Sequence, residues 1–410
     1  MIPPPATTAR QPRAPAGSRS SPLPASLQRQ AWLATVFLFC PWVATLVLAY
    51  PIFRAHPLVL LALLPGAGVA LALQYQLWTY LGANHRQGMA APLFPDLGTA
   101  NWITLLRGVA IVALAGFLPL ALLPGQALPP ALSWAPGLLY LGVSLADLAD
   151  GFVARRQRRQ TELGQQLDIA TDGAGLLVAL LVAVSLQRLP ACTLLVGLAY
   201  YLFLGGIRWR RQRHLPLIAL QSRPYARIIA GIQMGLVAMA LLPIFHPICT
   251  TIAALLVMTP LLAGFARDYL VVSCRINIDS NQHTVVDHWS GLVLGRYLPL
   301  GLRLAILVSA LLALATNVAP PLPAWWLAAQ TLCCLLAVLG CLARSSALLL
   351  CLLLGSHWTP FGTALPSLIL FTLATTLLLT GTGPLSLWAP EEDILYRRNR
   401  DQSLATGGQP

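Results

Sequence analysis

Hydrophobic residues are grouped along this chain in long runs, and short polar segments separate the runs. A run of about 20 apolar residues can span the hydrocarbon core of a bilayer as a helix. Runs that reach or approach this length lie at 31–50, 57–80, 102–123, 134–152, 165–187, 190–207, 225–245, 249–270, 297–317, 324–342, 345–358 and 364–384. The pattern predicts an all-α integral membrane protein with about twelve transmembrane helices, of which the eleventh is short.

Composition agrees with this fold class. Apolar residues make up 57% of the 410 positions and charged residues only 10%, which leaves too little polar surface for a soluble protein. The eight cysteines form no CxxC pair, so they indicate neither a disulfide framework nor a zinc site. The net charge of +13 comes from arginines at the ends of apolar runs, where membrane lipids rather than nucleic acid are the expected partner. Self-association into a homodimer is left open.

The distribution of arginine also predicts topology. With the amino terminus inside, only Arg54 and Arg188 fall on the outer side, while the basic loops around 155–159 and 208–227 are cytosolic. We expect the inner (plasma) membrane of a bacterium, with the active site facing the cytosol. The predicted regions are a disordered cytosolic tail (1–30), two accessory helices (31–97), a six-helix core (98–275), a polar linker (276–296), a four-helix region (297–388) and a cytosolic tail (389–410).

Four aspartates lie at the end of the fourth predicted helix and at the start of the fifth. Asp147 and Asp150 are three residues apart, and Asp168 and Asp172 are four residues apart, so each pair lies on one helical face. The basic segment between the pairs turns the chain, so the two pairs can face each other near the cytosolic boundary. Four carboxylates in a confined site repel one another unless divalent cations neutralise them. The spacing therefore predicts a site for Mg²⁺ or Mn²⁺.

Single aspartates at helix ends often serve only as caps, and Arg155, Gly151 and Gly164 could be a topology anchor and helix-packing glycines. Their joint spacing instead matches D-x2-D-G-x2-A-R-x8-G-x3-D-x3-D, which is the signature of the CDP-alcohol phosphatidyltransferase family. Every fixed position is present: Asp147, Asp150, Gly151, Ala154, Arg155, Gly164, Asp168 and Asp172. The chain also resembles the family upstream, where Asn101, Thr104 and Arg107 match the N-x2-T-x2-R opening of its first core helix.

The resemblance implies an enzyme that transfers a phosphoalcohol group, here phosphatidyl, from a CDP-linked lipid such as CDP-diacylglycerol to an alcohol, with release of CMP, in phospholipid biosynthesis. By resemblance, Asp147, Asp150 and Asp168 hold the metal with help from Asp172, which is also the expected general base. The same resemblance assigns the nucleotide side of the site to Asn101, Thr104, Arg107, Gly151, Ala154, Arg155 and Gly164.

The acceptor pocket is less defined. A phosphorylated acceptor could bind the cytosolic loop that carries Arg208, Arg210, Arg211, Arg213, Arg223 and Arg227. Such loops also carry arginine simply to satisfy the positive-inside bias. The polar segment with His283, Asp287 and His288 is read as a linker, because nothing supplies a full set of metal ligands.

Two other classes of function stay open at this point. One is a transporter that binds a cation through intramembrane carboxylates, although no inverted repeat is evident. The other is a non-catalytic scaffold, because the four-helix region, which includes Gly340 to Arg344 and ends near Trp388, weakly resembles DoxX-like membrane proteins. Intact carboxylates favour the enzyme.

Overall fold

The computed structural model describes residues 23–86, 92–121, 123, 128–218, 224–275, 297–315, 323–356, 365–383 and 385–391. Within these ranges the chain is helical, and extended pairing is limited to isolated bridges. Each of the twelve predicted apolar runs contains a helix. Seven helical segments of the described chain are long and apolar enough to cross a membrane, and five further apolar helices are shorter. The predicted all-α membrane fold is therefore confirmed.

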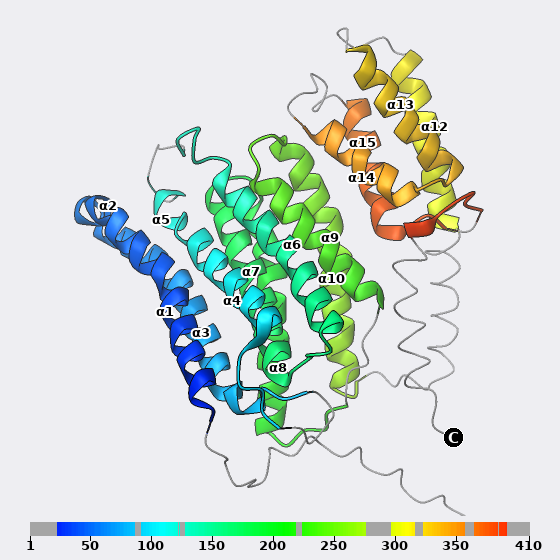
Figure 1. Cartoon of the computed structure of the whole chain (residues 1–410). Helices are drawn as coiled ribbons and strands as arrows, with labels where there is room; N and C mark the ends of the chain where they lie inside the picture. The colour runs from blue at the N-terminus through cyan, green and yellow to red at the C-terminus, as the bar shows by residue number, and fades with distance from the viewer. Residues whose placement is uncertain are drawn as a thin grey trace, which may run out of the picture.

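Six helices form the central bundle, which occupies the middle of Figure 1. They are α4 (Gly98–Ala115), α6 (Ala135–Arg156), α7 (Glu162–Ser185), α8 (Leu194–Gln212), α9 (Pro224–Leu241) and α10 (Pro247–Val272), with the short α5 (Leu118–Ala121) and η3 (Ala191–Thr193) between them. Helix α4 packs along both α6 and α7, so side chains of all three helices can meet at one point. The expected span 102–123 is divided, because α4 ends before Gly116 and α5 follows.

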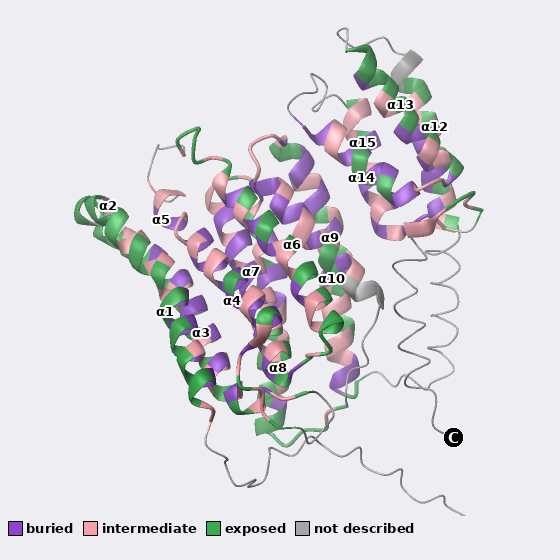
Figure 2. Ribbon diagram, viewed as in Figure 1, coloured by how far each residue is buried: buried purple, intermediate pink, exposed green. Residues whose placement is uncertain are grey.

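The amino-terminal helices cover one side of this bundle. They are α1 (Ala25–Leu48), α2 (Tyr50–Ala55), η1 (Pro57–Leu63), α3 (Leu64–Tyr80) and η2 (Leu81–Ala83). Helices α1 and α3 pack against α4, and a Cβ at Gly108 of α4 would meet Leu73 of α3 at 2.5 Å and Leu38 of α1 at 3.1 Å. The outward face of α1 and α2 is largely exposed in Figure 2. Such a face meets lipid in a membrane.

Helix α1 begins at Ala25, earlier than the expected start at residue 31. The first turns carry polar residues such as Gln28 and Gln30, so hydropathy alone does not reveal them. Pro24 occupies the N-cap, where its missing N–H costs nothing. Residues 1–22, which make up most of the predicted tail, lie outside the described residues.

The carboxyl-terminal helices form a separate group beside α9 and α10 in Figure 1. They are α12 (Leu298–Ala315), α13 (Ala324–Leu339), α14 (Ala343–Gly355) and α15 (Leu365–Thr380). Contact with the bundle runs through α10 and α15, and the backbone N–H of His246 donates to Gly355 O at 2.8 Å. The predicted linker 276–296, with its two histidines, lies outside the described residues, as do residues 392–410.

Two buried arginines in this group donate hydrogen bonds to backbone carbonyls at helix ends. Arg303 Nε donates to Val338 O at 2.9 Å, near the end of α13, and Arg344 Nη1 donates to Leu378 O at 3.0 Å, near the end of α15. Carbonyls in the last turn of a helix have no partner within the helix and carry partial negative charge. These arginines therefore have a structural explanation.

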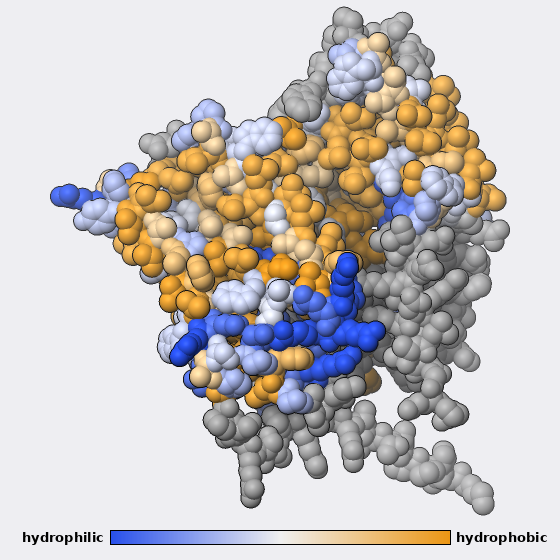
Figure 3. All heavy atoms as spheres, viewed as in Figure 1, coloured by the Kyte–Doolittle hydropathy of each residue, from blue (hydrophilic) through white to orange (hydrophobic). Residues whose placement is uncertain are grey.

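The surface is divided between apolar and polar zones. In Figure 3 apolar side chains cover most of the visible face, and hydrophilic side chains gather toward the lower end of the bundle. Arginines at the carboxyl ends of α6 and α8, including Arg156 and Arg211, are exposed. A polar end on an apolar body suits a protein whose bundle spans the bilayer.

Candidate active site

The four signature aspartates lie where α6 ends and α7 begins. Helix α6 ends after Arg156, and Arg158 takes a left-handed conformation with φ of 51°, which turns the chain. Helix α7 then starts at an N-cap, Thr161, whose hydroxyl accepts a hydrogen bond from Gly164 N at 3.0 Å. This short connection holds the two aspartate pairs at the same level of the bundle.

The structure brings the carboxylates together as their spacing predicts. Oxygen atoms of Asp147, Asp150 and Asp168 all lie within 4.8 Å of one another. The Asp150 side chain is 7% exposed, whereas that of Asp147 is 29% exposed and those of Asp168 and Asp172 are each 43% exposed. The cluster thus has a closed side at Asp150 and an open side at the other three residues.

Arg107 of α4 completes this cluster. Its side chain is fully buried, and Nη1 lies 2.8 Å from Asp150 Oδ2 and 2.7 Å from Asp168 Oδ1. The other terminal nitrogen, Nη2, lies 2.9 Å from Asp147 Oδ1 and also pairs with Asp172 Oδ1. The guanidinium therefore contacts all four carboxylates. This differs from the expectation that Arg107 faces the nucleotide, because its terminal N–H groups are directed at aspartates.

Thr104 and Asn101, one and two turns before Arg107 on α4, serve different partners. The Thr104 hydroxyl lies 2.9 Å from Asp150 Oδ2 and can donate to it. The Asn101 side-chain amide donates to Leu97 O at 2.8 Å, and both side chains are buried. A Cβ at Gly164 would meet Asn101 Oδ1 at 2.5 Å, so the absence of a side chain there lets α7 approach α4 closely. In this structure Gly164 is a packing glycine.

The remaining signature residues lie toward the polar end of α6. Arg155 is exposed, and a Cβ at Gly151 would come within 3.1 Å of its Nη1. Ala154 is partly exposed beside them. Arg155 is thus exposed one turn after Gly151, and arginine binds phosphate well.

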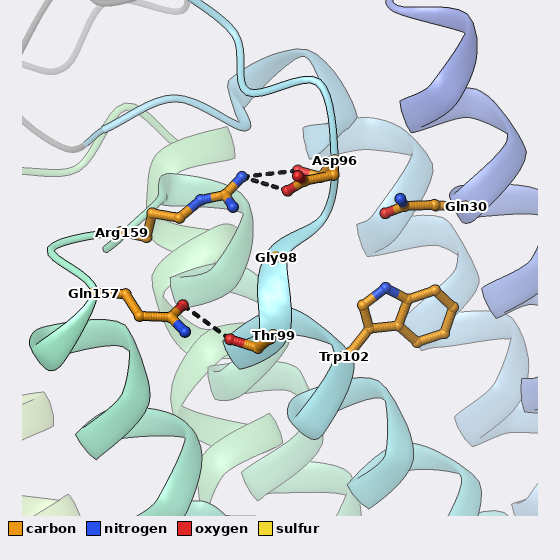
Figure 4. Close-up of a pocket in the computed structure, with 7 residues that line it drawn as sticks. All are labelled: Gln30, Asp96, Gly98, Thr99, Trp102, Gln157 and Arg159. Atoms are coloured by element: carbon orange, nitrogen blue, oxygen red, sulfur yellow. Dashed lines mark hydrogen bonds and ion pairs between the residues drawn. The ribbon is translucent and has the colours of Figure 1, made fainter.

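A second feature at this end is an open pocket of about 550 Å³, shown in Figure 4. It is lined by Gln30, Asp96, Gly98, Thr99, Trp102, Gln157 and Arg159. None of these residues belongs to the signature. Arg159 pairs with Asp96, Thr99 Oγ1 donates to Gln157 Oε1 at 2.8 Å, and Gln30 Oε1 accepts from Leu97 N at 2.8 Å.

These contacts join the start of α4 to the end of α6 and to α1. Arg159 also stacks on the ring of Phe94, 4.3 Å from its centroid, so the segment before α4 is held from two directions. Sequence reasoning missed these residues, because a contact between Gln30 and Leu97 has no signature in spacing. The pocket lies where α1, α4 and α6 meet, and its residues fix the position of α4.

The predicted acceptor arginines do not form one group in the described structure. Arg208 and Arg211 are exposed on α8. Arg210 is buried and donates through Nη2 to Pro216 O at 3.1 Å and to Ser273 O at 3.0 Å, so it joins the ends of α8 and α10. Arg223 and the side chain of Arg227 lie outside the described residues.

The carboxylate cluster fits a divalent metal by its chemistry. Carboxylate oxygens are the ligands that Mg²⁺ and Mn²⁺ prefer. One guanidinium balances only one of four ionised carboxylates, which leaves a strong negative charge at this end of the bundle. Arg107 pairs with one oxygen of each aspartate, and Asp147, Asp150 and Asp168 each offer an oxygen to a common metal position.

Comparison with protein families matches the central bundle to the model for CDP-alcohol phosphatidyltransferase, over residues 97–262. This part of the chain is similar to that family. The match contains the whole signature and the upstream Asn101, Thr104 and Arg107. Neither a search of curated proteins nor a search of solved structures returned a match to the chain.

The match implies a transferase that moves a phosphoalcohol group from a CDP-alcohol to an alcohol acceptor and that uses a divalent metal. The transporter and scaffold alternatives lose their support in this part of the chain. The matched region ends before the carboxyl-terminal helices, so the DoxX-like resemblance of 297–388 stays a prediction.

Proposed function

We propose that this protein transfers a phosphatidyl group from CDP-diacylglycerol to a small alcohol and releases CMP, as a step in phospholipid biosynthesis. The observation that carries the proposal is the gathering of Asp147, Asp150, Asp168 and Asp172 around Arg107 within a family-matched membrane bundle. A lipid donor suits a site at the polar end of lipid-facing helices, because its acyl chains can stay in the bilayer.

In this proposal Asp147, Asp150 and Asp168 hold Mg²⁺ or Mn²⁺, with Asp172 beside them. The metal, when bound, neutralises the charge of the donor's pyrophosphate. Arg155, together with the space beside Gly151 and Ala154, receives the phosphate of the leaving CMP. Arg208, Arg211 and Arg213 are exposed, and in this proposal they attract a phosphorylated acceptor.

Asp172 is the general base in this account. Its carboxylate contacts Arg107 through Oδ1, and the partial exposure of the side chain gives an acceptor access to it. The acceptor oxygen forms a bond to the phosphorus that carries the diacylglycerol group, and its proton passes to Asp172. The bond from that phosphorus to the bridging oxygen breaks, and CMP leaves with the bond's electrons. We place these events on the cytosolic side of a bacterial inner membrane.

The experiment that tests donor and acceptor uses purified protein in detergent or vesicles with Mg²⁺. CDP-diacylglycerol is supplied with one acceptor at a time: glycerol 3-phosphate, inositol phosphate or serine. Mass spectrometry should detect one phosphatidyl product that accompanies CMP in equal amount. Turnover of a CDP-linked water-soluble alcohol, with none of CDP-diacylglycerol, would contradict the lipid donor while leaving the family reaction in place.

A further inference from the structure

The contacts of Arg107 match its hydrogen-bonding capacity closely. The two terminal nitrogens of a guanidinium carry four N–H bonds in a fixed plane. Nη1 contacts Asp150 and Asp168, and Nη2 contacts Asp147 and Asp172, so each of the four carboxylates has one contact. Nε is buried without a hydrogen-bond partner among the described residues. The terminal donors are therefore fully committed to the aspartates.

Arg107 approaches the carboxylates from the buried side. Its side chain is 0% exposed, while Asp147, Asp168 and Asp172 are partly exposed. The aspartates come from two helices, α6 and α7, and Arg107 from a third helix that packs along both. The guanidinium therefore contacts the cluster from its buried side and leaves the exposed side uncovered.

We propose that Arg107 is a positioning residue: it draws the four carboxylates of α6 and α7 together from below and orients their outer oxygens toward the metal. This inference rests on the proposed metal site and adds the group that assembles it. Ionised carboxylates at this separation repel each other, so without a central cation their side chains turn apart. Part of the free energy of metal binding must then be used to bring the four carboxylates together again.

A lysine cannot replace Arg107 in this role. An ammonium group keeps the positive charge but has three donors and no planar fork, so it cannot contact four carboxylates in this arrangement. Arg107→Lys thus separates geometry from charge. Arg107→Gln removes both. Loss of a partner that orients metal-ligating carboxylates typically weakens metal affinity by roughly 10–100-fold.

The test measures Mn²⁺ affinity by electron paramagnetic resonance on the purified full-length protein. Arg107→Lys and Arg107→Gln should each bind Mn²⁺ roughly 10–100-fold more weakly than wild type. Arg156→Gln is the matched control, because Arg156 is an exposed arginine at the end of α6 and has no described contact with the cluster. It should bind Mn²⁺ as wild type does. Circular dichroism checks that each variant folds. If Arg107→Gln does not fold, the inference is tested by comparing the Mn²⁺ affinity of Arg107→Lys with that of wild type.

Activity as a function of metal concentration adds a second readout. Because excess metal can regroup the carboxylates, CMP release by Arg107→Lys should recover substantially at high Mn²⁺, with the half-maximal concentration shifted upward. A merely structural role would lower the maximum without this shift.

The direction of the affinity change decides the inference. Unchanged or tighter Mn²⁺ binding in folded Arg107→Lys would overturn it, since tighter binding means that Arg107 competes with the metal. Specific Mn²⁺ binding by wild type, lost in Asp150→Asn, supports the metal site independently. Absence of specific binding by wild type would overturn both the metal site and the role of Arg107.

Discussion

Arg107 Nη1 donates to Asp150 Oδ2 at 2.8 Å, and both side chains are buried where α4 crosses α6. A buried ion pair is costly to maintain unless its polar atoms have partners. Here the same Asp150 oxygen lies within reach of the Thr104 hydroxyl, and the guanidinium continues to three further carboxylates. The stability of the bundle and the geometry of its active site are therefore linked at α4.

Thr104→Val should destabilise the protein, because it removes a donor from a buried carboxylate while keeping the shape of the side chain. A lost hydrogen bond to a charged group costs about 1–3 kcal/mol. Thermal unfolding in detergent with EDTA measures the effect. Thr171→Val is the control: this buried threonine donates to Leu167 O in its own helix, so its loss should change stability much less. Equal melting temperatures for Thr104→Val and wild type would contradict the assigned contact.

Gly164→Ala should impair both folding and turnover. Its Cβ would lie 2.5 Å from Asn101 Oδ1, too close for two non-bonded atoms, so either the Asn101 side chain leaves its hydrogen bond to Leu97 O or α7 moves away from α4. Overpacking of this kind typically costs about 1–3 kcal/mol. Gly142→Ala on α6 is the matched control, because a Cβ there meets nothing within 4 Å. It should be neutral or slightly stabilising, and similar melting temperatures for the two variants would refute the close approach of α4 and α7.

Gln30→Met should weaken the attachment of α1 to the start of α4. The change leaves the N–H of buried Leu97 without its acceptor, at a cost of about 1–3 kcal/mol. Gln30→Glu keeps an acceptor oxygen and should restore stability and turnover. Gln28→Met alters an exposed neighbour and serves as the control. If Gln30→Met and Gln28→Met have the same melting temperature and the same turnover rate, the contact from α1 does not support the site.

The sequence was sufficient to predict the helices and the meeting of the four aspartates, because apolar length and signature spacing are local properties. It did not predict what Arg107 contacts, since that depends on how α4 crosses α6 and α7. One signal was present: an arginine inside an apolar run needs compensating charge, and the four aspartates are the nearby source. The contact between Gln30 and Leu97 could not be predicted, because these residues are 67 positions apart and meet only in the fold. The early start of α1 could not be predicted from hydropathy, because its first turns are polar.

Asp172→Asn should separate base catalysis from metal binding. If Asp172 is chiefly the base, turnover should fall by roughly 10²–10⁴-fold while Mn²⁺ affinity and donor binding change little. Calorimetry with the CDP-linked donor at fixed Mg²⁺, alongside CMP release, measures both quantities. Asp168→Asn is the comparison, and it should lose metal affinity and rate together. Parallel losses in Asp172→Asn would show that it is a ligand and not the base.

Metal-dependent release of CMP is the most direct measurement of the central claim. Purified wild-type protein in vesicles that contain CDP-diacylglycerol and an acceptor should release CMP with Mg²⁺ or Mn²⁺ and stop in excess EDTA. Asp150→Asn should lower the rate by several orders of magnitude, because removing a metal ligand leaves the charge that develops on the pyrophosphate uncompensated. Full release of CMP in excess EDTA, or a wild-type rate in Asp150→Asn, would contradict the account.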